Sequence, residues 1–234
     1  MTESTGPGRP SAARGRAVRE LADAVLEVLL PHPVRVAVDG VGASGKTVLA
    51  DEIADALAGS GRQIIRAGVD GFHNGPDARY RRGHESPEGY YRDSFDHDAI
   101  RRFVVDPLGP DGDRRYRTAV YDFRTESAVD SPELAADPDA VLLFDGVFLL
   151  RSELRSAWDY SIFVDTSFEV TLERALARDI DLFGDVESVR RRYKTRYIPG
   201  ERMYLEIEHP RDIADVVVVN DAPARPSLRW RAAR

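Results

Sequence analysis

Short apolar runs alternate with amphipathic stretches along this chain of 234 residues. Strands are predicted where Val, Ile, Leu and Phe cluster over a few residues, at positions 34–38, 64–69, 141–144, 160–165 and 216–219. The run at 141–144 is continuously apolar, which is typical of a strand buried on both faces of a parallel sheet. We therefore predict a three-layer α/β fold, in which helices cover both faces of a central parallel sheet.

Apolar residues at helical spacing predict the layers that cover this sheet. One helix ends before a Pro-His-Pro segment and carries its apolar face on Val18, Leu21, Val25, Leu26 and Leu29. Further helices are expected at 48–57, at 98–105, after Ser167 and at 186–193. Residues 1–16 and 222–234 are rich in Pro and Arg, so we expect a disordered N-terminal tail and a C-terminal tail on either side of one domain at 17–221.

Two segments depart from the regular alternation of strands and helices. Residues 74–96 are polar and rich in Tyr and Arg, and a loop of this length tends to be a lid or a substrate loop. Residues 116–123 predict an edge strand, so we expect an insertion with a small β element over about residues 71–130. A basic helical stretch that stops at Pro199 predicts a lid over about residues 178–202.

Composition and charge exclude several classes of function. The net charge of −7 argues against a nucleic-acid-binding surface, which needs clustered basic charge. The chain has no cysteine, which excludes disulfides, thiolate catalysis and cysteine zinc sites, and it has no apolar run long enough to span a bilayer. We expect a cytoplasmic protein without nucleic-acid or membrane partners, whose homo-oligomeric state stays open.

The chemistry of the chain is centred on a glycine-rich stretch between a predicted strand and a predicted helix. It fits the pattern G-x-x-x-x-G-K-[ST] of phosphate-binding loops, in residues Gly40, Val41, Gly42, Ala43, Ser44, Gly45, Lys46 and Thr47. In such a loop, backbone N–H groups and a helix N-terminus face an anion, the lysine neutralises the β- and γ-phosphates, and the threonine hydroxyl binds Mg²⁺. A nucleoside triphosphate site with Mg²⁺ is therefore our central hypothesis.

Two aspartates follow predicted strands, at the edge where open parallel sheets bind their ligands. Asp70 follows the strand at 64–69 and could accept a proton from an attacking hydroxyl or help to hold Mg²⁺. The alternative is a carboxylate that caps a turn with Gly71. Asp145 ends the apolar run at 141–144, where P-loop enzymes hold Mg²⁺ beside the phosphate loop.

Basic residues near the C-terminal half predict a lid over the triphosphate. Arg174 and Arg178 are four residues apart and therefore share one helix face. With residues 190–196 they could supply positive charge to the transferring phosphoryl group and exclude water. A solvated basic surface is the alternative, above all for residues 190–192.

The order of these motifs resembles that of uridine kinases, within the phosphoribulokinase, uridine kinase and pantothenate kinase set of P-loop kinases. Besides the phosphate loop, the resemblance covers the blocks at 70–73, 93–96, 120–123, 144–146, 164–166 and 174–179. It implies ATP and Mg²⁺ as cofactors, with Thr47, Asp70 and Asp145 as metal ligands and with Lys46, Asp70, Arg174 and Arg178 as catalytic residues. The implied acceptor site contains Asp70, Phe72, His73, Tyr90, Asp93, Tyr121 and Glu126.

Two departures from uridine kinases leave the acceptor open. Glu126 stands where those enzymes carry a histidine that contacts the pyrimidine, and a carboxylate that only accepts hydrogen bonds predicts a preference for cytidine over uridine. Residues 71–72 and 87–90 resemble pantothenate kinase as much as uridine kinases. We expect transfer of the γ-phosphoryl group of ATP to the 5′-hydroxyl of uridine or cytidine. A pantothenate-like or sugar-like acceptor is the first alternative, and a non-catalytic nucleotide-binding regulator is the second.

Overall fold

Parallel pairing brings the apolar runs of the sequence into one sheet. The computed structural model describes residues 11–232 and contains a six-stranded sheet in the order β10-β9-β8-β1-β7-β2. Neighbouring strands pair in parallel except for β10 with β9. The strands are β1 (Val34–Gly40), β2 (Ile64–Gly68), β7 (Val141–Gly146), β8 (Tyr160–Asp165), β9 (Val216–Val219) and β10 (Ser227–Trp230).

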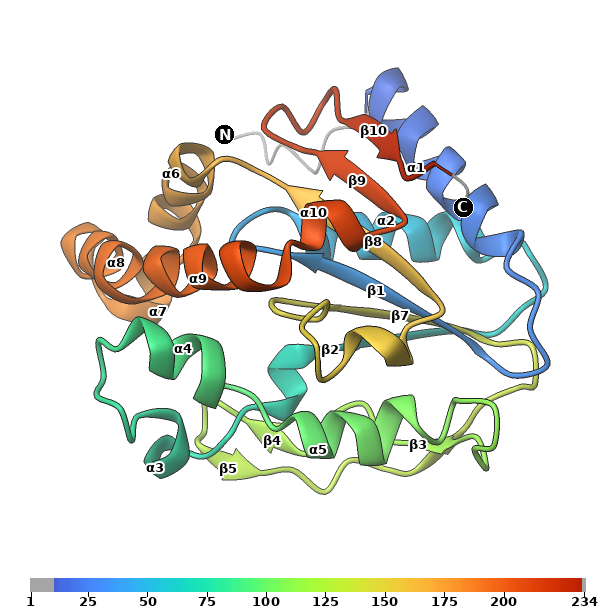
Figure 1. Cartoon of the computed structure of the whole chain (residues 1–234), viewed down its shortest axis with the longest axis horizontal. Coiled ribbons are helices and arrows are strands. Elements are labelled where there is room, and N and C mark those ends of the chain that lie inside the picture. The colour runs from blue at the N-terminus through green and yellow to red at the C-terminus, as the bar shows by residue number, and fades with distance from the viewer. Residues whose placement is uncertain (1–10, 233–234) are drawn as a thin grey trace, which may run out of the picture.

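Helices cover both faces of the sheet, because alternate residues of each strand point to opposite sides. On one face, Val34, Val36 and Val38 of β1 pack in a cluster with α1 and α2. On the other face, Ala37 of β1 and Phe144 of β7 belong to a cluster that includes residues of α4, α5 and α9. The helices concerned are α1 (Ala12–Leu26), α2 (Lys46–Leu57), α4 (Pro87–Asp93), α5 (His97–Ile100) and α9 (Ile198–Glu208). Figure 1 shows the sheet between these layers, which confirms the predicted three-layer α/β fold.

The register of the central strands brings their carboxyl ends to one edge of the sheet. β1 lies between β7 and β8, with Val38 opposite Asp145 and Gly40 opposite Val164. On the other side of β7, Gly68 at the end of β2 is also opposite Asp145. The phosphate loop that follows β1 is therefore adjacent to the strand ends that carry both predicted aspartates.

The structure differs from the sequence predictions at both ends of the domain. α1 begins at Ala12, with Ser11 as its N-cap, and so includes residues that we had assigned to a disordered tail. Arg14 in this first turn is buried, and its guanidinium pairs with Glu52 of α2, which compensates the buried charge. Near the other end, β10 pairs with the edge of β9, where Leu228 packs against the core. The predicted tail residues 1–10 and 233–234 lie outside the described residues.

The insertion contains more helix than the sequence suggested. α3 and α4 lie within the segment 74–96 that we predicted as a loop, and each begins with a proline, whose fixed φ suits the first turn of a helix. The predicted edge strand at 116–123 is replaced by two short strands that pair with β6 and β5. The elements are η1 (Val69–Phe72), α3 (Pro76–Arg79), η2 (Arg101–Val105), β3 (Arg115–Tyr116), β4 (Tyr121–Asp122), β5 (Ser127–Ala128) and β6 (Leu134–Ala135).

The predicted lid is a set of short helices that continues into α9. Figure 1 shows α6, α7 and α8 gathered at one end of the molecule, near α4. The predicted stop at Pro199 is wrong, because α9 begins at Ile198 and contains this proline near its start. The remaining elements are η3 (Arg155–Ala157), α6 (Phe168–Arg178), α7 (Ile180–Phe183), α8 (Val186–Arg192), η4 (Tyr193–Tyr197) and α10 (Pro210–Ile213). Within residues 11–232, no helix combines the length and apolar character that crossing a bilayer requires.

Gly71 allows the backbone after β2 to approach the insertion closely. A Cβ atom at this position would lie 2.7 Å from the carbonyl oxygen of Thr118 and 2.9 Å from Cβ of Ala119. We predict that Gly71→Ala lowers the free energy of unfolding by about 1–3 kcal/mol, as overpacking typically does. Urea denaturation followed by circular dichroism measures this change. Gly59→Ala is the matched control, since a Cβ at Gly59 meets no atom within 4 Å, and equal stability of the two variants would contradict the prediction.

Candidate active site

The phosphate loop curls at the N-terminus of α2, with two residues in left-handed backbone conformation. These are Ala43, with φ of 58°, and Gly45, with φ of 93°. A side chain at position 45 is also excluded by space, because its Cβ would lie 2.8 Å from Nδ2 of Asn220. This Asn220 amide donates to the carbonyl oxygen of Ser44 at 2.7 Å and supports the loop from behind. The loop therefore holds the conformation in which its N–H groups and the helix N-terminus can face an anion.

The hydroxyl of Thr47 meets the carboxylate of Asp145 at the start of α2. Thr47 Oγ1 donates to Asp145 Oδ2 at 2.6 Å. The other carboxylate oxygen, Oδ1, accepts from Arg66 of β2 at 2.9 Å, and Arg66 also pairs with Asp51. Nearby, Nζ of Lys46 donates to the carbonyl oxygen of Val41 at 3.3 Å. The cation of the loop is thus next in sequence to the residue whose hydroxyl contacts Asp145.

A cavity of about 720 Å³ opens in front of this loop. Its volume lies within the range of small-molecule binding sites. The predicted site residues that line it are Gly42, Ala43, Lys46, Thr47, Asp70, His73, Tyr90, Asp145 and Arg178. The phosphate loop, both strand-end aspartates and part of the predicted acceptor site therefore face one space.

Aromatic rings form the wall of this cavity beyond Asp70. The ring of His73 lies between Phe95, at a centroid distance of 4.6 Å, and Phe123, at 4.7 Å. Its Nδ1 atom is 3.0 Å from the carbonyl oxygen of Asp70, and burial lowers the pKa of His73, which favours a neutral ring that donates this hydrogen bond. Thr118 and Arg124 complete this end of the cavity. Phe95 and Phe123 belong to the blocks at 93–96 and 120–123, whose predicted acceptor residues are their neighbours Asp93 and Tyr121.

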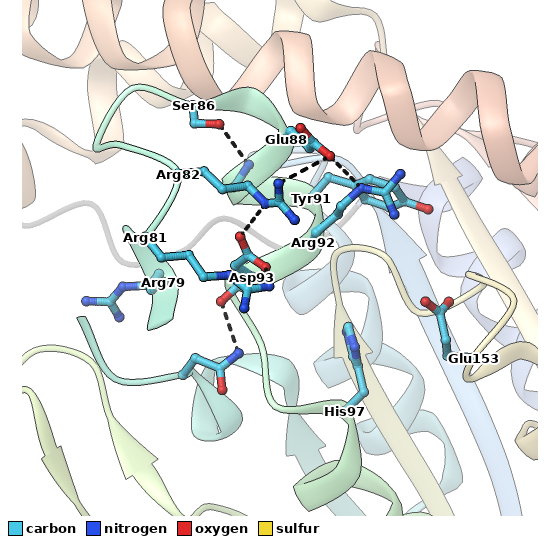
Figure 2. Close-up of polar contacts among 12 residues, drawn as sticks. Arg79, Arg81, Arg82, Ser86, Glu88, Tyr91, Arg92, Asp93, His97 and Glu153 are labelled. Carbon is cyan, nitrogen blue, oxygen red and sulfur yellow. Dashed lines mark hydrogen bonds and ion pairs between the residues drawn. The ribbon is translucent and has the colours of Figure 1, made fainter. Parts of the chain in front are cut away.

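Asp93, predicted to bind the acceptor, does not line the cavity and serves the insertion itself. Figure 2 shows its buried carboxylate next to Arg81 and Arg82, and both arginines form ion pairs with it. Burial alone would raise the pKa of Asp93, but these two guanidinium groups outweigh it and hold the pKa below its usual value. The backbone carbonyl of Asp93 also accepts from Asn74, at 3.0 Å. The acid therefore joins the two ends of the segment that we had predicted as a loop.

Glu126, Tyr121 and Phe72 also lie outside the cavity lining. The Glu126 carboxylate pairs with Arg79 and accepts from the Tyr121 hydroxyl, which is 3.0 Å away. Glu126 itself has φ of 51° in the turn between β4 and β5, and Phe72 is fully buried in the core. In this arrangement both carboxylate oxygens of Glu126 contact protein groups while the side chain stays partly exposed, and its contact with a base stays a prediction.

The two predicted lid arginines lie in different places. Arg174 donates to the carbonyl oxygens of Ser44, at 3.1 Å, and of Asn220, at 2.7 Å, so it supports the back of the phosphate loop. Arg178 lines the cavity and pairs with Asp179, with 2.6 Å between Nε and Oδ1. Arg178 is therefore the member of the pair that can approach a ligand in the cavity.

Two of the three arginines of α8, Arg190 and Arg192, have partners outside the proposed phosphate site. Arg190 pairs with Glu187 of the same helix. Arg192 donates to the hydroxyl groups of Tyr197, at 3.0 Å, and of Tyr80, at 3.2 Å. These contacts join α8 to η4 and to the insertion, which fits a structural role for this part of the predicted lid.

The structure adds a buried acid that the sequence analysis did not single out. Glu201 of α9 has an exposed fraction of 0% and lines the cavity. Its Oε1 atom accepts from the backbone N–H of Gly42 at 2.7 Å and lies 3.4 Å from the hydroxyl oxygen of Tyr90. Burial raises the pKa of Glu201 to about 7. Nothing in the neighbouring sequence distinguishes this residue from an exposed helix glutamate.

A second buried carboxylate secures the start of the phosphate loop. Asp39 accepts from the backbone N–H groups of Gly40, at 2.7 Å, and Leu150, at 3.3 Å, and from the hydroxyl of Tyr204. Burial raises the pKa of Asp39 to about 6. Tyr204 is three residues after Glu201, so both side chains project from one face of α9. This helix therefore contacts the loop at two points, Asp39 and Gly42.

Carboxylates outnumber cations in the lining of the cavity. The acids are Asp70, Asp145, Asp179, Asp181 and Glu201, and the cations are Lys46, Arg124 and Arg178. Among residues 11–232, no group of three or more His, Cys, Asp or Glu side chains is arranged to hold a metal ion by itself. Mg²⁺ in kinases is usually bound by one or two carboxylates together with phosphate oxygens and water. The adjacent oxygens of Thr47 and Asp145 therefore fit Mg²⁺ that arrives with a triphosphate.

Comparison with known proteins connects this geometry to a family. The family model described as "Phosphoribulokinase / Uridine kinase family" matches residues 36–219. The chain is 27% identical over 204 residues to a uridine kinase of Brevibacillus brevis, with 84% of this chain and 89% of that protein covered. It is 28% identical over 205 residues to uridine-cytidine kinase A of Dictyostelium discoideum, where 82% of this chain but only 38% of the relative is covered.

Solved structures share the fold at lower sequence identity. A protein described as a possible uridine kinase from Bacillus stearothermophilus superimposes with a TM-score of 0.67 and 22% identity, over 86% of this chain and 97% of that chain. The D-glycerate 3-kinase of Cryptococcus neoformans superimposes with a TM-score of 0.65 and 14% identity, over 93% and 97% of the two chains. These similarities agree with the strand order and helical layers described above.

The buried acid Glu201 makes a testable contribution to stability. An acid whose pKa is raised by folding favours the folded state below its unfolded pKa, and this contribution is lost as pH rises through about 7. Glu201→Gln removes the ionisation. We predict that the stability of this variant relative to wild type increases by about 2–3 kcal/mol between pH 5 and pH 8, as expected for a shift of about two pKa units.

Urea denaturation at a series of pH values, without nucleotide, measures this difference. Glu206→Gln is the matched control, because Glu206 lies on the same helix but is exposed. A pH dependence that is the same in wild type and Glu201→Gln would show that Glu201 keeps an ordinary pKa in the folded protein.

Proposed function

Because this chain belongs to the phosphoribulokinase/uridine kinase family, we propose that it transfers the γ-phosphoryl group of ATP to the 5′-hydroxyl of a pyrimidine nucleoside. The chain is a phosphotransferase that acts on a hydroxyl group of a small molecule, and the nucleoside is the finer part of the proposal. One observation carries it: Lys46, the Thr47–Asp145 pair and Asp70 share a cavity with an aromatic wall.

The donor half of the cavity suits a triphosphate with its metal ion. The N–H groups of the phosphate loop and the N-terminus of α2 would bind the phosphate oxygens, and Lys46 would neutralise the β- and γ-phosphates. Thr47 and Asp145 would hold Mg²⁺, to which Asp70 could add a further oxygen. The bound ion would withdraw negative charge from the transferring group. Arg66 would keep the Asp145 carboxylate oriented toward Thr47 through its 2.9 Å contact.

Asp70 lies between the donor and acceptor halves and suits the role of general base. In the transfer, the nucleoside hydroxyl oxygen forms a bond to the γ-phosphorus while the bond to the bridging oxygen breaks and ADP leaves. The hydroxyl proton would pass to the Asp70 carboxylate. His73 supports this arrangement, because its ring holds the Asp70 carbonyl oxygen at the end of β2.

The acceptor half suits a flat ring. His73, Phe95 and Phe123 would present aromatic surface to a planar base, and aromatic stacking contributes to affinity. Arg79 and Tyr121 contact the Glu126 carboxylate, which does not line the cavity, and this argues against a role for Glu126 in discriminating cytosine from uracil. We therefore propose that both pyrimidine nucleosides are acceptors.

Short helices beside the cavity suit a cover over the reacting groups. Leu182 and Phe183 of α7 line the cavity together with Arg178. Apolar side chains there would exclude water from the transferring phosphoryl group, while Arg178 would add positive charge near it.

An acceptor screen tests the proposed function directly. We expect uridine and cytidine to support rapid ATP consumption, and pantothenate and free sugars to support little, because the acceptor end is aromatic. Coupled detection of ADP measures each rate. Rapid turnover with pantothenate or a sugar, and none with nucleosides, would show that the acceptor belongs to one of these alternative classes. ATP binding without turnover on any acceptor would favour a non-catalytic nucleotide-binding regulator.

Asp70 provides a second test, at the level of one residue. We predict that Asp70→Asn lowers kcat by about 10²-fold or more while ATP still binds, since removal of a general base typically has this effect. Steady-state rates and ATP titration give the two quantities. The control is Asp77→Asn, an exposed carboxylate of α3 that does not line the cavity and should keep the wild-type rate. A wild-type rate for Asp70→Asn would contradict the role of general base and support the alternative, in which Asp70 caps a turn.

A further inference from the structure

Glu201 is a buried acid that the proposed transfer does not use. It projects from α9 toward the phosphate loop, on the same face as Tyr204, which contacts Asp39 at the start of the loop. One helix therefore carries two groups that hold the loop. A carboxylate at such a place requires an explanation, because an apolar or amide side chain would cost less to bury.

The contacts of Glu201 suit a positioning role for the loop. Oε1 accepts the Gly42 N–H at 2.7 Å, and a Cβ atom at position 42 would lie only 3.0 Å from this oxygen. Tyr90 of α4 faces the same oxygen across 3.4 Å. The carboxyl group thus joins three parts of the cavity, namely the phosphate loop, α9 and the insertion that carries α4.

The second oxygen of Glu201 is buried without a partner. Oε2 is closed to solvent and makes no hydrogen bond to any described residue. The ionisable groups that face the carboxyl are Lys46 of α2, Tyr90 of α4 and Tyr193 of η4, and burial raises the pKa of both tyrosines, which keeps them neutral. Lys46 is therefore the positive charge that compensates an ionised Glu201, and it is also the residue expected to neutralise the phosphates.

We propose that Glu201 is a positioning residue for the phosphate loop and that it takes up a proton from solvent when ATP binds. This inference rests on the proposed binding of ATP at the loop. The incoming triphosphate competes with Glu201 for the charge of Lys46 and adds negative charge to a cavity whose lining already has more acids than cations. A protonated Glu201 removes this repulsion, and its carbonyl oxygen still accepts the Gly42 N–H.

The pKa of Glu201 in the protein without nucleotide makes such a proton uptake measurable. Burial raises its pKa to about 7 in the protein without nucleotide, so most molecules are ionised at pH 8. A further rise on ATP binding would then be visible as uptake of about half a proton or more per ATP. Two further acids near the cavity are buried, but three donors hold the oxygens of Asp39, and Arg178 and Tyr193 contact Asp179.

Calorimetric titration with ATP at pH 8, in two buffers of different ionisation enthalpy, measures the number of protons taken up. We expect uptake by wild type and by Glu206→Gln, the exposed glutamate of the same helix, and little or none by Glu201→Gln. The difference between variants removes the contribution of ATP itself. ATP binding with equal proton numbers in wild type and Glu201→Gln overturns the inference and leaves the proposed function intact. No ATP binding to wild type overturns both.

Kinetics separate positioning from a general structural effect. Glu201→Gln keeps an oxygen for the Gly42 N–H and should keep kcat, with a KM for ATP equal to or below that of wild type at pH 8. Glu201→Ala leaves the N–H without its partner and should raise the KM for ATP about 10-fold or more. Gly42→Ala, which displaces the carboxyl without removing it, should behave like Glu201→Ala. If Glu201→Gln weakens ATP as much as Glu201→Ala does, the proton uptake is refuted, since the neutral form would not be the one that binds.

Discussion

The position of β1 between β7 and β8 is the constraint on which the site depends. Parallel pairing in this order brings the end of β1, which carries the phosphate loop, next to the end of β7, which carries Asp145. β2 pairs with the far side of β7 and leads into Asp70. Because parallel strands all end at the same edge, three segments far apart in sequence converge without any special loop. The hydroxyl of Thr47 then reaches Asp145 directly.

Helix α9 supplies buried polar contacts to this edge of the sheet. Glu201 and Tyr204 hold the phosphate loop, and one turn further Glu208 accepts from the Tyr91 hydroxyl at 2.8 Å and from the Ser152 N–H at 3.0 Å. Spacings of three and four residues place these side chains on one face of the helix. The same face therefore contacts the loop, the segment after β7 and the insertion through buried polar groups. Such groups stabilise one arrangement only when their partners are in place.

Some residues of the insertion stabilise the insertion itself, and others face the cavity. Asp93 and Glu126 satisfy the arginines of the insertion and stabilise its short helices and turns. The aromatic rings of Phe95 and Phe123, which lie in the same two stretches of chain, line the cavity around His73. An acid in or near a recognised block is therefore not by itself a ligand, because nearby guanidinium groups can pair with it.

The sequence alone determined the layers of the fold, the phosphate loop and the two strand-end aspartates. These features depend on residues that are neighbours in the sequence. An apolar run indicates a buried strand, and a glycine-rich stretch between a strand and a helix indicates a phosphate-binding loop. It also indicated His73 and Tyr90, which line the cavity. It did not determine which of several charged residues face that cavity. Arg174 contacts the carbonyl oxygens behind the phosphate loop, whereas Arg178 lines the cavity, although both lie on one predicted helix face. No feature of the sequence around Glu201 indicated that this residue is buried or lines the cavity. Only the tertiary structure decided these cases, because the direction and ionisation of a charged side chain are set by partners distant in sequence and by burial, neither of which local spacing encodes.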